Sequence, residues 1–459
     1  MDEQDRRRAR DRAQVIQRQL GGQEVLAVAI TYVDNVGVTR VKGVPLASVD
    51  SVAAWGVGIS PVFDAFGVDD IAITGRFAPG AVGDLRMHPD LDRITVLAAQ
   101  PGWAWAPGDR YDQQGNPHPF DQRALTRKAV AALADAGFTA KAAIEVEWVI
   151  GLPSAGGEFV PAISGPAYGM ARLIESGNYL RDVLSALAAQ NVDVVQVHPE
   201  YAPGQLELSV AAEDPVGAAD TYVLVRETIR AVSQQHGLRV SFSPKVTAEG
   251  VGNGGHVHLS IARDGRNLFA GGNGRFGMTE TAESFAAGIL GRLPALLVVG
   301  APSVASYLRL IPQHWAGAYA AWGLENRETA LRLVTGATGS QAEAANIEIK
   351  CFDQTFNPYL AIAGLLFAGL AGITENATLA EPIDVDPATL GTKELLRHGI
   401  RPLPTSLTEA VAAFEADHTL IDAFGEPLAT TLVDLRKAEV QRFATATPEE
   451  VAAALRWVH

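Results

Sequence analysis

The stretch AAIEVEWVI, residues 142–150, predicts a buried β-strand with two acidic residues on one face. Apolar residues such as Ile144 and Trp148 alternate with Glu145 and Glu147, so both carboxylates point to the side opposite the apolar residues. Carboxylates two residues apart on a strand lie about 7 Å from each other and repel. The pattern indicates either a solvated strand face or a cavity that holds a cation, and a metal ion is the more specific interpretation.

The bulk composition limits the classes of protein to which the chain can belong. Its 459 residues allow two or more domains, and 47% hydrophobic with 19% charged residues is typical of a globular protein. The net charge of −15 argues against nucleic-acid binding, which needs a basic surface. The single cysteine, Cys351, cannot form an internal disulfide and indicates a reducing, cytoplasmic setting.

No membrane segment or signal peptide is predicted. Residues 1–20 have no apolar run behind their charges and predict an amphipathic helix that ends at Gly21 and Gly22. The uncharged stretch PYLAIAGLLFAGLAGI, residues 358–373, is short for a membrane span, which needs about 20 residues. Because Pro358 fits a helix start, this stretch predicts a fully buried core helix, and no membrane association is expected.

The chain divides into a β-rich part and a larger mixed part. Short β-like runs cover residues 24–33, 37–46, 70–75 and 93–99. Helices are predicted over residues 121–137, about 166–190, 216–237 and 447–458. The intervening stretch 106–122 is rich in Pro, Gly, Asp and Gln, the composition of a linker. These patterns predict an α+β protein with an N-terminal domain of residues 1–105 and a second domain of residues 106–459.

Further acidic residues and histidines flank apolar strands. They are Glu200 and Glu207 within residues 192–210, His256 and His258 after the loop GVGNGG, and Glu348 beside Lys350. Each of these residues alone is weak evidence for a metal site, because a single glutamate or histidine in a strand is usually solvated or packed. Five carboxylates and a histidine in one cavity, however, would need two divalent cations, and such ligands suit Mg²⁺ or Mn²⁺. These metals often serve phosphoryl transfer.

Basic residues suited to a phosphate group occur in SYLRLIPQHWAGAYAAWGLENRETALRLV, residues 306–334. Arg309, Arg327 and Arg332 are spaced through otherwise apolar sequence. Any one of them would be read as a surface arginine. Together with the carboxylates they indicate a site for nucleotide phosphates and an acidic substrate.

These motifs, in this order and spacing, resemble type I members of the glutamine synthetase superfamily over nearly the whole chain. The similar segments are EVEW, HPEYAPGQLEL, GNGGHVHLS, SYLRLIP, NRETALRLV and NIEIK with NPYLAIAGLLFAG. The resemblance implies a small β-grasp-like N-terminal domain and a larger catalytic domain with a curved antiparallel sheet flanked by helices. It also implies a double-ring homo-oligomer, with a dodecamer as the expected size and each active site between two neighbouring subunits.

The resemblance assigns a role to each motif residue. One metal would be held by Glu147, Glu200 and Glu207. The second metal, which faces ATP, would be held by Glu145, His256 and Glu348. The nucleotide would lie by His258, Ser260 and Arg332, and the transferring phosphoryl group by Arg327 and Arg332. Glutamate would be held by Gly252, Arg309, Arg327 and Lys350. In the family reaction, ATP phosphorylates the γ-carboxylate of glutamate and a nitrogen nucleophile displaces phosphate.

Departures from the family pattern lie around the amine. Trp315 stands near the position of an acid that helps to bind ammonium, while Asp64 keeps the acid of the flap segment and Tyr168 is retained beside it. A pocket with aromatic faces suits an organic ammonium group better than ammonium. Lys350 replaces an arginine and loses its bidentate geometry.

The pattern is therefore similar to the γ-glutamyl-amine ligases of the superfamily, which act on amines such as ethanolamine or polyamines. Two alternatives stay open at this point, a glutamine synthetase that uses ammonium and a non-catalytic ring-forming paralogue. The full set of metal ligands argues against the second alternative.

Overall fold

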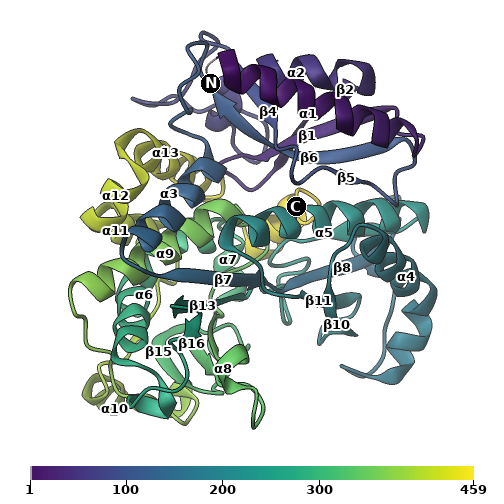
Figure 1. Cartoon of the computed structure of the whole chain (residues 1–459). Coiled ribbons are helices and arrows are strands. Elements are labelled where there is room, and N and C mark those ends of the chain that lie inside the picture. The colour runs from purple at the N-terminus through teal and green to yellow at the C-terminus, as the bar shows by residue number, and fades with distance from the viewer. Residues whose placement is uncertain (1–2) are drawn as a thin grey trace.

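The computed structural model describes residues 3–459 and has two parts, an N-terminal sheet domain and a larger domain of two sheets and packed helices (Figure 1). The helices are α1 (Glu3–Gly21), α2 (Val49–Trp55), α3 (Gln122–Asp135), α4 (Met170–Ala189), α5 (Pro215–Gln235), α6 (Glu280–Gly300), α7 (Ser306–Arg309), α8 (Gln341–Ala344), α9 (Pro358–Thr374), α10 (Thr392–Arg397), α11 (Leu407–Glu415), α12 (His418–Phe424), α13 (Glu426–Arg442) and α14 (Pro448–Leu455). The strands are β1 (Ala27–Val33), β2 (Thr39–Pro45), β3 (Val57–Ile59), β4 (Leu85–Pro89), β5 (Thr95–Val96), β6 (Trp103–Tyr111), β7 (Thr139–Ile144), β8 (Val146–Leu152), β9 (Val160–Pro161), β10 (Val194–Pro199), β11 (Gln205–Val210), β12 (Arg239–Ser241), β13 (Val257–Arg263), β14 (Arg266–Asn267), β15 (Tyr319–Leu324), β16 (Thr329–Val334), β17 (Asn346–Ile349) and β18 (Arg401–Pro402).

The N-terminal domain is a six-stranded sheet in which β1 lies between β2 and β6. Helix α1 buries Ala13, Ile16 and Leu20 in the core of this sheet, and with α2 it lies on the side away from the rest of the chain (Figure 1). The predicted amphipathic helix and β-rich domain are confirmed. The predicted run at residues 70–75 forms only an isolated bridge, between Phe66 and Ala72.

The predicted linker begins inside this sheet. Strand β6 runs to Tyr111 and pairs with β1 and β4, with Ala106 opposite Ile30 and Asp109 opposite His88. The linker prediction is therefore wrong for residues 106–111. We propose that the division between the two domains follows Tyr111 rather than residue 105.

A buried arginine joins the two domains. Arg123 of α3 binds Asp220 of α5 through two bonds, Nε to Oδ1 at 2.9 Å and Nη2 to Oδ2 at 2.8 Å. The same guanidinium reaches Asp90 at 2.6 Å and Asp109 at 2.9 Å on the N-terminal side. Asp220 is fully buried, and Arg123 is its closest cation, with Arg93 Nε further away at 3.4 Å and the Tyr359 hydroxyl donating to it at 2.6 Å.

Arg123→Met is expected to lower the free energy of unfolding by about 3–5 kcal/mol, because the buried Asp220 carboxylate would lose its two-bond partner and keep only Tyr359 and the more distant Arg93. Urea unfolding of the two proteins measures the loss. The matched control is Arg127→Met, since the Arg127 side chain is 40% exposed and its pair with Asp109 should contribute about 0–1 kcal/mol. Equal losses in the two variants would contradict this account.

The larger domain holds a five-stranded and a seven-stranded sheet. The orders are β10-β11-β8-β12 with β9 on β8, and β14-β13-β17-β16-β15-β18 with β7 on β13. Their neighbouring strands are antiparallel, except that β15 and β16 run parallel. The α+β prediction is confirmed, with two antiparallel-rich sheets in place of one.

The stretch 142–150 connects these sheets. It was predicted as one strand, but the strand is interrupted at Glu145. Strand β7 ends at Ile144 and pairs with β13, whereas β8 begins at Val146 and pairs with β11 and β12. At the interruption the backbone N–H of Glu145 donates to the carbonyl of His256 at 3.0 Å. The acidic face therefore lies where the two sheets meet.

Apolar helices form the core beside the seven-stranded sheet. The predicted core helix is α9, which starts after the Asn357 cap and is almost fully buried. Helix α6 is long and apolar enough to cross a membrane by length and composition, and 61% of that window is buried inside the protein. The two helices approach so closely that a Cβ on Gly288 would lie 2.3 Å from the carbonyl oxygen of Ala368. The apolar surface of α6 is thus used in the core.

Candidate active site

A cavity of about 640 Å³ opens where the two sheets meet. Its walls include the predicted residues Glu145, Glu147, Tyr168, Glu200, Glu207, Gly252, His256, Arg309, Trp315, Arg327, Arg332, Glu348 and Lys350. They come from both sheets and from the loops that follow β9, β10, β12, α7 and β15. Residues far apart in the sequence thus meet in one place, as their motifs predicted.

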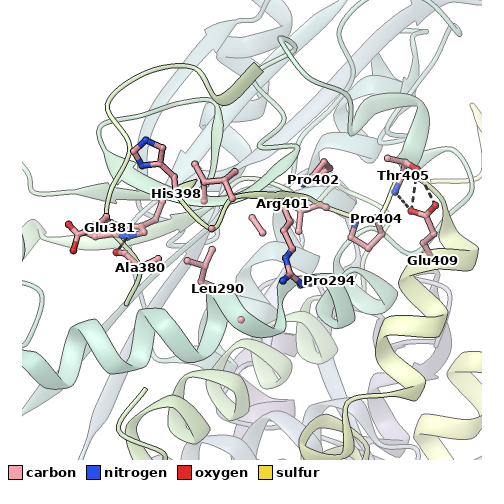
Figure 2. Close-up of a pocket in the computed structure, with 17 residues that line it drawn as sticks. Leu290, Pro294, Ala380, Glu381, His398, Arg401, Pro402, Pro404, Thr405 and Glu409 are labelled. Atoms are coloured by element: carbon pink, nitrogen blue, oxygen red, sulfur yellow. Dashed lines mark hydrogen bonds between the residues drawn. The ribbon is translucent and has the colours of Figure 1, made fainter. Parts of the chain in front are cut away.

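A second cavity of about 610 Å³ lies between α6, β15 and the segment around β18 (Figure 2). Leu290, Pro294 and other apolar side chains line much of it, and its acidic side chains already have partners. Glu409 accepts the Thr405 N–H at 2.7 Å, and Glu381 pairs with an arginine of the segment before α6. It contains none of the residues that were predicted to carry chemistry.

The first acidic group lies at the junction of β7, β13 and β17. Glu145, His258 and Glu348 offer ligand atoms within 4.8 Å of one another. His258 faces Glu348 across the β13–β17 ladder, and its Nε2 lies 3.0 Å from Glu145 Oε1. His256, the predicted ligand, lies beside them with Nδ1 2.8 Å from Glu145 Oε2. His258, expected near the nucleotide, is therefore a further candidate metal ligand.

The second acidic group lies on β10 and β11. His198, Glu200 and Glu207 offer ligand atoms within 4.8 Å of one another. Glu147, the predicted third ligand, stands opposite Glu207 in the β8–β11 ladder. Its Oε2 accepts the Gly254 N–H at 2.8 Å. His198 was missed by the sequence analysis, although it precedes Glu200 by two residues and so belongs to the same strand face.

The charges of these groups interact strongly. Burial, together with Glu207 and Glu200, raises the pKa of Glu147 well above its usual range. Burial and the nearby Glu145 raise the pKa of Glu207 to about 10. Burial would also raise the pKa of Glu348, but Lys350 and His256 outweigh it and hold the value at about 2. Without a cation, the carboxylates of the second group therefore compete for protons.

Both groups fit divalent cations. Carboxylate oxygens with an imidazole nitrogen are a ligand set that Mg²⁺ or Mn²⁺ accepts. In the second group His198 Nδ1 is buried and has no hydrogen-bond partner within residues 3–459. A cation would use this nitrogen and would compensate the repulsion between Glu147, Glu200 and Glu207.

The metal-free protein is expected to lose thermal stability as the pH rises from about 6 to about 9. Glu207 titrates at about 10 in the folded state against 4.5 ordinarily, so the folded state binds more protons than the unfolded state between these values. His258, with its pKa raised to about 9 because Glu145 outweighs the effect of burial, acts in the same direction. Its contribution is complete below about pH 6.5 and is lost as the pH rises through 9.

Because a divalent cation replaces these protons, Mg²⁺ should raise the melting temperature more at high pH than at low pH. Differential scanning fluorimetry with Mg²⁺ or with a chelator, at about pH 6 and at about pH 9, measures the difference. A Mg²⁺ shift that is equal at the two pH values would contradict the assignment of these carboxylates.

The three predicted arginines differ in how far their donors are already used. Arg309 is buried and donates to the carbonyls of Phe352 and Lys350 at 3.1 and 3.3 Å. Arg332 binds Glu348 Oε2 at 3.0 Å. Arg327 is exposed at the cavity and makes no hydrogen bond or ion pair with any residue between 3 and 459. Arg327 is therefore the arginine that is free to receive an anion.

Glycines allow the loop before His256 to approach the carboxylates. A Cβ on Gly252 would lie 1.9 Å from the carbonyl oxygen of Pro244. A Cβ on Gly254 would lie 2.6 Å from Arg309 Nη2 and 2.8 Å from Glu147 Oε1. No larger residue fits at these positions without displacing the backbone or the site.

Aromatic side chains line the cavity beside the second acidic group. The Tyr168 hydroxyl donates to Glu200 Oε1 at 2.5 Å, and its ring lies 5.4 Å from that of His198. Trp315 is 45% exposed, and its ring lies 5.1 Å from that of Tyr201, a residue that the sequence analysis did not select. The predicted aromatic wall is thus built from two ring pairs.

Three predicted residues are not among those that line the cavity: His258, which lies behind Glu145, and Asp64 and Ser260. Asp64 is fully buried, and both its carboxylate oxygens accept from Arg110 Nη1, at 2.9 and 2.8 Å. His118 lies 3.2 Å from the same carboxylate. Ser260 pairs with Lys141 in the β13–β7 ladder, away from the cavity. The structure therefore does not bring Asp64 or Ser260 to the site of its own chain, whereas His258 still contacts Glu145 there.

Known proteins resemble this chain over most of its length. The family model for the catalytic domain of glutamine synthetase matches residues 119–453. A gamma-glutamylpolyamine synthetase, GlnA3, from Streptomyces coelicolor is 54% identical over 449 residues, which cover 97% of this chain and 96% of the relative. A glutamine synthetase from Halobacterium salinarum is 30% identical over 373 residues, covering 80% of this chain and 81% of the relative.

Solved structures are also similar. The crystal structure of a novel glutamine synthase homolog aligns with a TM-score of 0.84 and 32% identity, covering 94% of this chain and 98% of that chain. A complex of GmaS with ADP aligns with a TM-score of 0.82 and 27% identity, covering 94% and 96% respectively.

Proposed function

This chain belongs to the glutamine synthetase family, and we propose that it joins the γ-carboxylate of glutamate to an organic amine at the expense of ATP, with a polyamine as the favoured amine. The observation that carries the proposal is the 54% identity to a gamma-glutamylpolyamine synthetase over 97% of the chain. Two glutamine synthetases that resemble it are each 30% identical. The ammonium-using alternative is therefore the second candidate.

The acidic groups would hold the metals of the reaction. His198, Glu200, Glu207 and Glu147 would form one site, and Glu145, His258, His256 and Glu348 the other. When bound, divalent cations supply positive charge that offsets the charge of the ATP phosphates.

Basic side chains of the protein would contribute the remaining positive charge at the site. Arg327 is free to contact the transferring phosphoryl group, while Arg332 is held against Glu348 and can orient that carboxylate. Arg309 and the Gly252 loop would hold the carboxylates of glutamate, and Lys350 adds a positive charge beside Glu348 at 3.2 Å. This arrangement supports formation of γ-glutamyl phosphate, which the amine then attacks.

The amine would lie along the aromatic wall. The faces of Trp315 and Tyr201 suit the alkyl stem and positive charge of an organic amine. Tyr168 lines the same cavity and donates a hydrogen bond to Glu200. We propose Asp64 as the residue that serves as acid and base for the amine. It would serve a neighbouring subunit only if its carboxylate becomes accessible beside Arg110.

Trp315→Ala is expected to raise the KM for the amine roughly 2–30-fold, which corresponds to the loss of a cation–π contact of about 0.5–2 kcal/mol. Steady-state kinetics with the amine varied at saturating glutamate and ATP measures the change. Trp55→Ala is the control, because Trp55 is a 52% exposed tryptophan at the end of α2 in the N-terminal domain. An unchanged amine KM in Trp315→Ala would show that Trp315 only packs its loop.

The chemical route has a direct isotopic test. Glutamate labelled with ¹⁸O in its γ-carboxylate should transfer one labelled oxygen to inorganic phosphate, because the γ-glutamyl phosphate bond forms through that oxygen. Mass spectrometry of the phosphate and of the amide product measures the transfer. Amide formation with unlabelled phosphate would refute the acyl phosphate route.

We also propose a double-ring homo-oligomer, with a dodecamer as the expected size, and a cytoplasmic setting. The buried, unpaired Cys351 supports a reducing compartment. Native mass spectrometry tests the assembly, since the mass must be a multiple of the 48.5 kDa chain. A hexamer would refute the double ring, and a monomer would refute shared active sites.

A further inference from the structure

We propose that Arg456 is a positioning residue that ties together the two loops beside the catalytic cavity, so that binding of glutamate and of the amine depends on it. The first loop, residues 153–169, includes the short strand β9 and, near its end, Tyr168. The second loop, residues 242–256, contains Gly252. Arg456 follows α14 and lies beyond the part of the chain that matches the family model, residues 119–453. The kinetic part of this inference rests on the proposed function, whereas its structural part does not.

One guanidinium contacts both loops. Arg456 Nε donates to the carbonyl of Val246 at 2.6 Å, and Arg456 Nη1 donates to the carbonyl of Gly157 at 3.1 Å. The two carbonyls are 89 positions apart in the sequence and belong to different loops. Hydrogen bonds from a charged donor are stronger than those between neutral groups, so this fork is suited to fixing the distance between the loops.

The backbone of the same segment holds the start of the second loop. The carbonyl of Arg456 accepts from the Ser241 hydroxyl, and the carbonyl of His459 accepts the Phe242 N–H at 3.0 Å. Together with the bond to the Val246 carbonyl, these contacts hold residues 241–246 against the end of the chain. Residues 456–459, which follow α14, therefore act as a brace for this loop.

Hydrogen bonds lead from the brace to the cavity. Within the loop, Asn253 Nδ2 donates to the Ser243 carbonyl at 2.8 Å, and the Asn253 N–H donates to the Pro244 carbonyl at 3.0 Å. Gln205 Nε2 then joins the Gly252 carbonyl, at 3.1 Å, to Glu147 Oε2, at 2.9 Å. A shift of residues 243–246 would thus reach both the glutamate loop and a candidate metal ligand.

The first loop is also fixed at its far end. The carbonyl of Gly165 accepts from Arg172 Nε at 2.9 Å, and Arg172 Nη1 donates to the carbonyl of Glu200 at 2.6 Å. Tyr168 lies between these anchors and bonds the Glu200 side chain. Arg456 restrains the start of this loop at Gly157, where no other side chain in the described part of the chain bonds the backbone.

Aromatic packing keeps the brace in place. The Trp457 ring lies 6.5 Å from that of Phe159 in the first loop, and the Arg239 guanidinium lies 3.8 Å above it. Gly151 of β8 makes room for this ring, because a Cβ there would lie 3.3 Å from Trp457. The brace thus packs against β8, the strand that contains Glu147. Arg456 supplies its polar contacts to the two loops.

The test compares Arg456→Gln and Arg456→Lys with the wild-type protein, and Arg263→Gln is the control. Arg263 is an exposed arginine that also lies over an aromatic ring, that of Phe138, but it bonds neither loop. In Arg456→Gln the KM values for glutamate and amine should each rise about tenfold, while kcat and the KM for ATP change less than about twofold. Arg456→Lys should recover part of the loss, because an ammonium keeps the charge but not the fork.

Hydrogen–deuterium exchange supplies a readout that does not need activity. In Arg456→Gln, amide exchange should accelerate in residues 153–163 and 244–254 but not in β15 or β16. If the wild-type protein has no ligase activity, the proposed function fails and the exchange result still decides whether Arg456 ties the loops. Unchanged exchange in these loops, or faster exchange throughout the protein, would overturn the inference. Unchanged KM values in an active enzyme would overturn its kinetic part.

Discussion

Arg327→Ala is expected to reduce amine-dependent turnover by about 10²- to 10³-fold, the loss typical of removing one preorganised charge from a transition state. Arg327 lines the cavity, is exposed, and has no partner within residues 3–459, so its charge is available to the transferring phosphoryl group. For the same reason the substitution should change the melting temperature little. Phosphate release under saturating substrates and a thermal melt measure the two effects.

The matched variant is Arg327→Lys, which keeps the positive charge but loses the planar fork, and which should recover part of the activity. Arg266→Ala, at an arginine of the β14 hairpin outside the cavity, should leave turnover unchanged. Near-normal turnover in Arg327→Ala would refute the role of this residue. A large loss of thermal stability would show that the arginine has a structural partner.

Glu207→Gln is expected to have a second large effect, with opposite consequences for activity and for stability. Turnover should fall by at least about 10²-fold, because Glu207 is a candidate ligand whose charge holds a cation. Above about pH 6 the metal-free variant should melt at a higher temperature than the wild type, since glutamine is neutral without the proton that Glu207, with its pKa raised to about 10, must take up on folding. The Mg²⁺-dependent rise in melting temperature should become smaller.

Fluorimetry of both proteins with Mg²⁺ and with a chelator tests this combination. Glu415→Gln is the control, because Glu415 is an acid at the end of α11 that pairs with Lys437 outside the cavity. A Glu207→Gln protein that is less stable without metal, or that keeps the wild-type Mg²⁺ shift, would contradict the metal assignment. It would indicate instead that Glu207 serves the fold.

Much of the candidate site could be predicted because it rests on strand alternation. Glu145 and Glu147, or His256 and His258, are two residues apart, and this spacing alone places each pair on one side of the backbone. The family resemblance then placed the separate motifs in one cavity, as the structure does. His198 shows what was overlooked, because the same spacing relates it to Glu200 and could have identified it.

Other features depend on contacts that a local pattern does not contain. The interruption at Glu145 arises because β7 and β8 pair with different sheets, yet alternation looks the same on both sides of it. Strand β6 contains Pro107 and Gly108, which are typical of linkers, but its pairing with β1 and β4 outweighs their low strand propensity. The burial of Asp64 against Arg110 joins residues 46 positions apart and is set by tertiary packing.

The most direct test of the account is phosphate release by the purified protein with ATP, Mg²⁺ and glutamate against a panel of ammonium, ethanolamine, putrescine and spermine. An organic amine should support turnover, a polyamine most strongly, and ammonium should support little or none. Turnover with ammonium alone would contradict this expectation, make the protein a glutamine synthetase, and leave the aromatic wall of Trp315 and Tyr201 as packing.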